Sequence, residues 1–332
     1  MEYKILFTDP GKASLVEFDR DTSPIGGNEI GGKTLYSLVS SGTELNVYLG
    51  NYDKEGLEWG RLPFTPGYAA VLQTDEVGRN VKDIAKGDLV YCMGRHMSYQ
   101  RIARDEAILL PAGLDPEKAA FARLMGVTWS SLTLTDTRPP AKVVVAGLGV
   151  VGLFGALIFQ NSGYDVYGYD PLQNRREAAQ AAGLDRVLPD APLDAPEICG
   201  KVSLFLECSA NEQALLDGLQ LIKRGGEVIL VGVPMVRRTE IYAQEVLNRI
   251  FRKCAIVRSG SEFQVSLKPA DFRTNSILEN QGMALQWIAE GKINVDPLYT
   301  VESPANPQQI YQAVLNRTME KLAIVFDWHD YV

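Results

Sequence analysis

The stretch VVVAGLGVVG, residues 143–152, decides the fold of the chain. It places a G-x-G-x-x-G pattern, formed by Gly147, Gly149 and Gly152, between an apolar strand and a helix. The first glycine permits a tight turn, the second lets the backbone approach a pyrophosphate, and the third lets the helix pack closely on the strand. The start of the helix would present free N–H groups to the anion, so the stretch predicts a phosphate-binding cradle.

A second strand follows the cradle and ends at Asp170. A carboxylate there would accept hydrogen bonds from ribose hydroxyls and repel a 2′-phosphate, which favours NAD over NADP. Arg175 lies close behind and could partly offset this preference, although a solvated helix face explains it equally well. A buried core residue is likewise the alternative for Cys208. The other cofactor-binding candidates lie at the start of the helix or at the ends of two later strands: Val150, Val151, Cys208, Ser209, Gly232 and Val233.

The rest of the chain divides into two patterns. Residues 142–257 alternate between strands and helices, which predicts a parallel sheet with helices on both faces. Residues 1–110 show short apolar segments separated by Gly, Pro, Asp and Asn, which is typical of a small barrel or sandwich. Asp115 and Pro116 predict the start of a helix that runs through residue 124. A short last strand over residues 322–326 is expected to rejoin the first domain.

Composition excludes several classes of protein. With 332 residues the chain has room for about two domains. Its 33 basic and 41 acidic residues give a net charge of −8, which argues against a nucleic-acid binder that relies on general basicity. The chain has only two histidines, which excludes a multi-histidine metal site, and none of its four cysteines forms a C-x-x-C pair.

The sequence also predicts a cytoplasmic protein that does not enter a membrane. Scattered single cysteines are typical of a reducing compartment. The N-terminus lacks a basic region followed by an apolar one, so no signal peptide is expected. The uncharged run over residues 143–159 is shorter than the roughly 20 residues that a membrane span needs.

Several short motifs occur in a fixed order along nearly the whole chain: Gly42-Thr43-Glu44, Pro66-Gly67, Gly87-Asp88-Leu89-Val90, the glycine pattern, Glu207-Cys208-Ser209 and Gly225-Gly226-Glu227-Val228. This order resembles the medium-chain dehydrogenase/reductase superfamily, the relatives of zinc alcohol dehydrogenases. The resemblance implies an α/β fold with two domains: a GroES-like β-barrel catalytic domain (1–122 and 273–332) and a Rossmann domain with a doubly wound parallel sheet that binds NAD (123–272). It also implies a homodimer or a dimer-based tetramer, joined at a sheet edge expected near residues 236–241.

The sequence departs from the zinc pattern of that family. Ser41, Tyr68 and Arg123 stand where zinc enzymes carry ligands, and the cysteine cluster of a structural zinc lobe is missing. No metal is therefore expected. Residues 35–44 look most like a zinc-less branch that includes bacteriochlorophyllide dehydrogenase-like and sugar- or cyclitol-dehydrogenase-like proteins.

Without a metal, side chains must handle the proton while a nicotinamide carries the hydride. The candidates are Glu44, Tyr68, Asn46, Tyr52 and His96. Tyr68 takes the place of a lost ligand, and the Arg123 cation could lower its pKa. Structural roles remain open for these residues, since Tyr68 could be an ordinary strand residue, Glu44 an ion-paired carboxylate, and Tyr52 a packing residue.

These patterns together predict a zinc-independent, NAD-dependent oxidoreductase. It would interconvert an alcohol and a ketone on a polar small molecule such as a sugar, polyol or cyclitol. One alternative is a zinc-free quinone or enoyl reductase, a class that usually prefers NADPH, so Asp170 counts against it. A second alternative is a sensor that binds NAD(H) without turnover. Neither nucleic acid nor a membrane is an expected partner.

Overall fold

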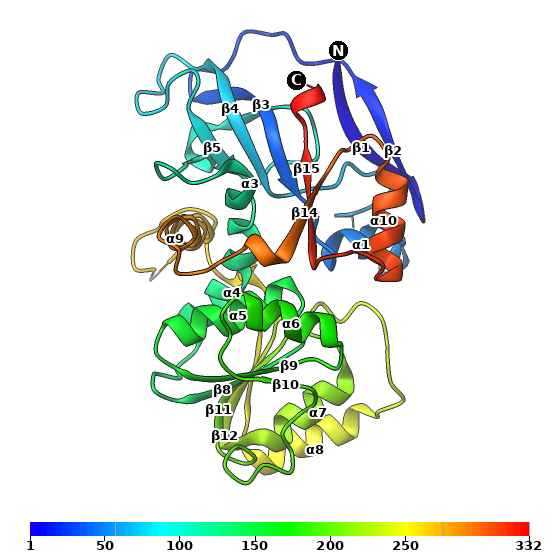
Figure 1. Cartoon of the computed structure of the whole chain (residues 1–332), viewed down its shortest axis with the longest axis vertical. Helices are drawn as coiled ribbons and strands as arrows, with labels where there is room; N and C mark the ends of the chain where they lie inside the picture. Colours follow the sequence, from blue (N-terminus) through cyan, green and yellow to red (C-terminus); the bar gives the residue numbers. More distant parts are fainter. Residues whose placement is uncertain (57, 274, 332) are drawn as a thin grey trace. The chain divides into compact units, whose positions relative to one another are not determined.

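The computed structural model describes residues 1–56, 58–273 and 275–331, which form two compact units (Figure 1). Unit 1 comprises three segments, Met1–Arg123, Leu285–Glu290 and Tyr299–Val332. Unit 2 comprises Leu124–Ala284 and Gly291–Leu298.

Unit 2 continues past the boundary expected at residue 272. The reason lies in helix α9 (Ile277–Ala289), whose first residues pack on helix α4 (Ala122–Leu134). The Asn280 side chain donates a hydrogen bond to Ser130 Oγ at 3.1 Å, and both groups are buried. Side-chain contacts of this kind leave no periodic signal in the sequence.

Unit 2 contains a six-stranded parallel sheet in the order β10–β9–β8–β11–β12–β13. Its strands are β8 (Lys142–Ala146), β9 (Asp165–Tyr169), β10 (Val187–Leu188), β11 (Val202–Glu207), β12 (Ile222–Leu230) and β13 (Ile256–Ser259). Counted along the chain, this is the strand order 3-2-1-4-5-6 of a doubly wound dinucleotide-binding sheet. The predicted Rossmann fold is therefore confirmed.

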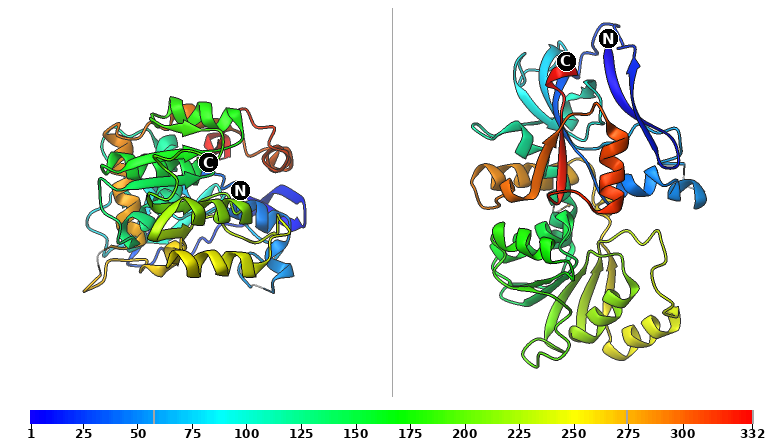
Figure 2. Two further views of the ribbon diagram at one scale, coloured as in Figure 1. Left: turned by 90° about the horizontal axis from the view of Figure 1, so that it is seen from below. Right: turned by 45° about the vertical axis from the view of Figure 1, so that its right-hand side comes forward.

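Four helices cover this sheet: α5 (Val150–Asn161), α6 (Gln173–Ala181), α7 (Glu212–Leu221) and α8 (Ala243–Lys253). Helices α5 and α6 lie on one face, and α7 and α8 on the other (Figures 1 and 2). The uncharged run over residues 143–159 is divided between β8 and α5. No helix within the described residues is long and apolar enough to span a membrane.

Unit 1 is built on a seven-stranded sheet in the order β14–β15–β3–β4–β5–β7, with β6 also paired to β3, and on a separate β1–β2 hairpin. The strands are β1 (Glu2–Asp9), β2 (Lys12–Phe18), β3 (Glu29–Leu38), β4 (Ala70–Val77), β5 (Leu89–Cys92), β6 (Tyr99–Ala103), β7 (Ile108–Leu109), β14 (Tyr299–Glu302) and β15 (Ala323–Asp327). Strand β15 pairs antiparallel with β3, with Val325 opposite Leu38. The expectation that the last strand rejoins the first domain is thus confirmed, as is the expected mixed α/β architecture.

The helices of unit 1 differ from expectation. Instead of one helix over residues 116–124, the chain forms α3 (Pro116–Ala119) and then α4. Residues 119–122 are all fully buried, so no polar residue marks the break between the two helices. Helices α1 (Thr43–Tyr48) and α2 (Asn51–Lys54) were not expected, because both are too short for a helical period to show. Helix α10 (Pro307–Asn316) begins after Asn306 as expected.

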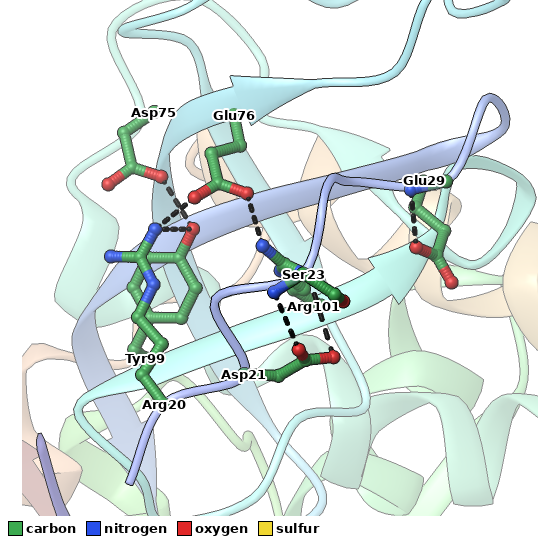
Figure 3. Close-up of polar contacts among 9 residues, drawn as sticks. Arg20, Asp21, Ser23, Glu29, Asp75, Glu76, Tyr99 and Arg101 are labelled. Atoms are coloured by element: carbon green, nitrogen blue, oxygen red, sulfur yellow. Dashed lines mark hydrogen bonds and ion pairs between the residues drawn. The ribbon is translucent and has the colours of Figure 1, made fainter.

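An ionic cluster fastens the segment between β2 and β3 to the sheet of unit 1 (Figure 3). The Arg20 guanidinium lies 3.6 Å from the centre of the Tyr99 ring, and both Arg20 and Arg101 bind the carboxylate of Glu76. The Tyr99 hydroxyl donates to Asp75 at 2.8 Å. A hollow of about 410 Å³ lies beside this cluster. Because Arg20 and Arg101 are already paired with a carboxylate, we interpret the cluster as structural.

Candidate active site

The turn between β8 and α5 has the geometry of a pyrophosphate cradle. Gly147 has φ +87°, and a Cβ on Gly152 would lie 1.9 Å from the Gly147 carbonyl oxygen, so neither position accepts a side chain easily. A Cβ on Gly149 would meet no atom within 4 Å, which leaves open space above the N-terminus of α5. The N–H groups of Val150 and Val151 have no intrahelical acceptor and are available to an anion. The residues present therefore fit a dinucleotide.

Asp170 follows β9 directly and is fixed beside the cradle. Its carboxylate accepts the backbone N–H groups of Leu148 and Leu172, each at 2.9 Å, and it is 1% exposed. The Arg175 guanidinium lies 3.1 Å from the same carboxylate. The expected ribose-binding carboxylate thus has a defined position, and a cation partly balances its charge.

The residues at the end of β11 also reach the cradle. The backbone nitrogen of Ser209 would lie 3.1 Å from a Cβ on Gly147, and the Cys208 Cβ would lie 3.0 Å from a Cβ on Gly152. Burial raises the pKa of the Cys208 thiol well above its usual range, which favours a protonated packing residue over a reactive one. Gly232 borders the same segment, whereas the Val233 side chain is 44% exposed.

Tyr68 in unit 1 is partly buried, and its hydroxyl donates to Ser40 Oγ. The Arg123 guanidinium lies 4.7 Å from the centre of the Tyr68 ring. Burial raises the pKa of Tyr68, and the opposing effects of Arg123, Ser40 and Thr43 do not reverse that direction. Arg123 does act to lower this pKa, as expected, but desolvation is the larger effect and the net shift is upward. Tyr68 is a neutral hydroxyl near pH 7 and is suited to donating a proton.

Glu44 lies in the interior of unit 1 and is 2% exposed. Its carboxylate accepts the Ser40 N–H at 3.0 Å and the Tyr311 hydroxyl at 2.5 Å, and it lies 3.1 Å from His96 Nε2. Burial, followed by the charge of Glu44, raises the pKa of Tyr311 well above its usual range, so Tyr311 serves as a donor. Glu44 is therefore a buried acceptor that links the segments carrying Ser40, His96 and Tyr311.

His96 is fully buried between the Ser37 hydroxyl and the Glu44 carboxylate. Its Nδ1 lies 2.7 Å from Ser37 Oγ, which also accepts the Trp328 indole N–H at 2.8 Å. Because the indole only donates, the Ser37 hydroxyl can donate to Nδ1 while Nε2–H donates to Glu44, and we assign this tautomer to His96. The order Ser37–His96–Glu44 is that of a nucleophilic triad. Ser37 is 0% exposed, however, so no substrate reaches it.

The two other candidates for proton transfer form their own contacts. The Asn46 side chain accepts from Asn51 at 2.8 Å and donates to the Gly42 carbonyl at 3.1 Å. Tyr52 packs its ring edge-on against Trp59, and burial raises its pKa. No hydrogen bond among the described residues links either side chain to Tyr68. Their catalytic roles remain predictions, and the geometry favours Tyr68.

The positions where zinc ligands were considered also have defined surroundings. Ser41 is exposed, whereas Tyr68 and Arg123 contact each other as described above. Within the parts of the chain that the structure describes, no group of three His, Cys, Asp or Glu side chains could hold a metal ion. Independence from zinc stays a prediction that rests on the residue types at these three positions.

Comparison with known proteins places this geometry in context. A family model described as zinc-binding dehydrogenase matches residues 150–267, which lie in unit 2 and exclude Ser41, Tyr68 and Arg123. An alcohol dehydrogenase of Geobacillus stearothermophilus is 25% identical over 70% of this chain and 81% of its own length. The L-galactonate-5-dehydrogenase of Escherichia coli K12 is 28% identical over 66% of this chain and 62% of its own length.

Solved structures share the fold over almost the full chain. Galactitol-1-phosphate dehydrogenase from Escherichia coli has a TM-score of 0.80 at 18% identity, covering 98% of this chain and 99% of that one. Acetophenone reductase from Geotrichum candidum, in complex with NAD, has a TM-score of 0.79 at 15% identity, covering 100% and 98%. Escherichia coli quinone oxidoreductase, complexed with NADPH, has a TM-score of 0.75 at 21% identity, covering 98% and 99%.

Proposed function

Because the chain belongs to the medium-chain dehydrogenase/reductase superfamily, we propose that it is an oxidoreductase that interconverts an alcohol and a ketone with NAD and without zinc. Relatives named alcohol dehydrogenase and L-galactonate-5-dehydrogenase support the alcohol class. The half-buried or exposed polar side chains of Ser41, Thr43 and Asn46 support a polar substrate such as a sugar, polyol or cyclitol.

The observation that carries the proposal is the cradle of unit 2 together with Asp170. The N–H groups at the start of α5 would hold the pyrophosphate, and the fixed Asp170 carboxylate would accept the adenosine ribose hydroxyls. When bound, a nicotinamide supplies or accepts the hydride. The carboxylate has about four acceptor sites, and Leu148, Leu172 and Arg175 use three of them. Because Asp170 is 1% exposed, we propose that the more exposed Arg175 side chain moves aside when a ribose hydroxyl binds.

We assign proton transfer to Tyr68. In the reducing direction its O–H bond breaks as the substrate oxygen takes the proton, which leaves a phenolate. The Arg123 guanidinium, 4.7 Å from the ring centre, stabilises that negative charge. In the oxidising direction the step runs in reverse and needs Tyr68 to have lost its proton to solvent first, so alcohol oxidation should speed up at alkaline pH. Ser40 Oγ accepts the Tyr68 hydroxyl before substrate arrives and so orients the donor.

Calorimetric titration of the protein with NADH and NADPH tests this proposal. NADH should bind more tightly, because Asp170 repels a 2′-phosphate. The alternative is an NADPH-linked reductase of activated double bonds, which the position of the Arg175 cation beside Asp170 favours because it partly balances the carboxylate charge. Tighter binding of NADPH than of NADH would support that class instead. Binding of NADH without turnover of any alcohol or ketone would support the sensor.

All four cysteines are free, which supports the proposed cytoplasmic location.

A further inference from the structure

We infer that Glu207 positions the cofactor site of unit 2 by fixing the turn that follows β11. The inference rests on the proposed function, because it concerns the binding of the same nicotinamide cofactor. Glu207 is the last residue of a mostly apolar strand and is 3% exposed. It acts through the backbone of the turn, residues 208–210, and is a positioning residue.

The side chain and the backbone of Glu207 bind two different segments. Its Oε1 accepts the N–H and the hydroxyl of Ser209, the former at 2.8 Å, and its Oε2 accepts the N–H of Ala210 at 3.1 Å. Its backbone carbonyl accepts the N–H groups of Val231 and Gly232, both at 2.8 Å. One residue therefore ties the turn after β11 to the end of β12.

Three glycines border this turn so closely that an added Cβ would press on it: Gly147 against Ser209 at 3.0 Å, Gly152 against Cys208 at 3.0 Å, and Gly232 against Ala210 at 2.5 Å. Two of these glycines, Gly147 and Gly152, belong to the pyrophosphate cradle. Because residues 208–210 pack directly against these glycines, a displacement of the turn would shift the backbone that receives the pyrophosphate.

The backbone of Ala210 has φ +53°, in the left-handed region that disfavours residues with a Cβ. The hydrogen bonds to Glu207 are therefore needed to stabilise this conformation of the turn. Burial raises the pKa of Glu207, and the hydrogen bonds from Ser209 and Ala210 oppose that shift by stabilising the carboxylate. In Glu207→Gln one oxygen becomes an NH₂ group, which cannot accept the Ala210 N–H. The free protein would then populate other conformations of the turn.

Titration of Glu207→Gln with NADH by calorimetry tests the inference. We expect the dissociation constant to rise about tenfold, because one hydrogen bond to a charged group is lost and only part of the population remains competent to bind. The matched control is Glu227→Gln on β12, which also neutralises a buried glutamate of the same sheet. Glu227 pairs with Leu204 and binds Arg258, away from the strand ends, so its NADH affinity should stay that of the wild type.

Two substitutions at Ala210 separate positioning from a general loss of stability. Adding Ala210→Gly should shrink the effect of Glu207→Gln to about twofold, because glycine adopts the left-handed conformation without a clamp. Ala210→Val should weaken NADH binding while leaving the carboxylate intact, and it serves as the test if Glu207→Gln does not fold. The inference is overturned if the glutamine variant binds like the wild type, if glycine gives no relief, or if Ala210→Val has no effect. Failure of the wild type to bind either cofactor would instead overturn the proposed function.

Discussion

Nε2 of His96 lies 3.1 Å from Oε2 of Glu44, and the two side chains are 0% and 2% exposed. Both residues were candidates for proton transfer, yet each is closed off within unit 1. The same carboxylate holds the Ser40 N–H, and Ser40 Oγ accepts the Tyr68 hydroxyl. Glu44 is thus linked to Tyr68 through Ser40, and we propose Tyr68, which is less buried than Glu44 and His96, as the residue that gives the proton.

Tyr68→Phe should lower turnover by roughly 10²–10⁴-fold, which is the usual contribution of a positioned acid or base. NADH affinity should not change, because the substitution removes only a hydroxyl of unit 1. Steady-state kinetics and calorimetry measure the two quantities. Tyr36→Phe on β3 is the matched control and should keep wild-type turnover.

The pH dependence of ketone reduction is a second test of Tyr68 as the proton donor. Because burial raises the pKa of Tyr68 above its ordinary value of about 10, the hydroxyl stays protonated through the neutral and mildly alkaline range. The reduction rate should therefore fall only above about pH 10. Full activity of Tyr68→Phe, or a fall in the wild-type rate near pH 8, would contradict the assignment.

Glu44→Gln should destabilise the protein by about 1–3 kcal/mol, because an NH₂ group then faces donors that need an acceptor. Urea unfolding measures the loss. The control is the second histidine–carboxylate pair of the chain, in which the half-exposed His329 lies 2.5 Å from Asp327. His329→Gln should cost less than about 1 kcal/mol, as surface pairs do. A Glu44→Gln variant as stable as the wild type would show that the buried acceptor is dispensable.

Most of the fold could be predicted from the pattern of apolar residues. The bounds of α5 and β9 match the expected ones, since α5 is a mostly apolar segment that follows Gly149, and β9 is a short segment between Gly163 and Asp170. The site could be predicted only where it is local in sequence, as in the cradle. The contact of Glu44 with Tyr311 joins residues 267 positions apart, which no motif reveals. Glu207 did leave a signal, since it is a charged residue at the end of a mostly apolar strand.

Asp170→Ala should weaken NADH binding by about 10–100-fold, the range for losing hydrogen bonds to a charged group, and should relax the preference against NADPH. Arg175→Ala should sharpen that preference, since it removes the cation 3.1 Å from the carboxylate. Arg176→Ala is the control, because Arg176 binds backbone carbonyls of residues 170 and 171. Calorimetric titration of each variant with NADH and NADPH measures the ratio of the two affinities. An unchanged cofactor ratio in Asp170→Ala would remove Asp170 from the account of specificity.

We also propose that the protein is a homodimer joined through β13. This strand ends the sheet of unit 2, and Ile256 on it is 44% exposed. An unpaired edge strand invites pairing with a second copy across a two-fold axis. The edge was expected near residues 236–241, but that segment turns back towards α7, where Arg238 N–H donates to Glu212 at 3.1 Å.

Light scattering should therefore give the mass of a dimer, and Ile256→Lys should shift it towards a monomer, because a charge on an edge strand blocks pairing. Val301→Lys provides the control, since Val301 is similarly exposed on β14, one of the two edge strands of the sheet of unit 1. A monomeric wild type at micromolar concentration would refute the proposal, and dissociation by Val301→Lys alone would move the interface to unit 1.

The central claim is oxidation of an alcohol with NAD and without zinc, and the most direct test is turnover by metal-stripped protein. The protein would be treated exhaustively with a chelator, checked by metal analysis, and assayed for NADH formation with a panel of polyols, sugars and cyclitols at alkaline pH, because oxidation needs the deprotonated Tyr68. We predict that at least one of them is oxidised and that added zinc does not raise the rate, because Tyr68 performs the proton transfer. Turnover that appears only after stoichiometric zinc is restored would contradict the account.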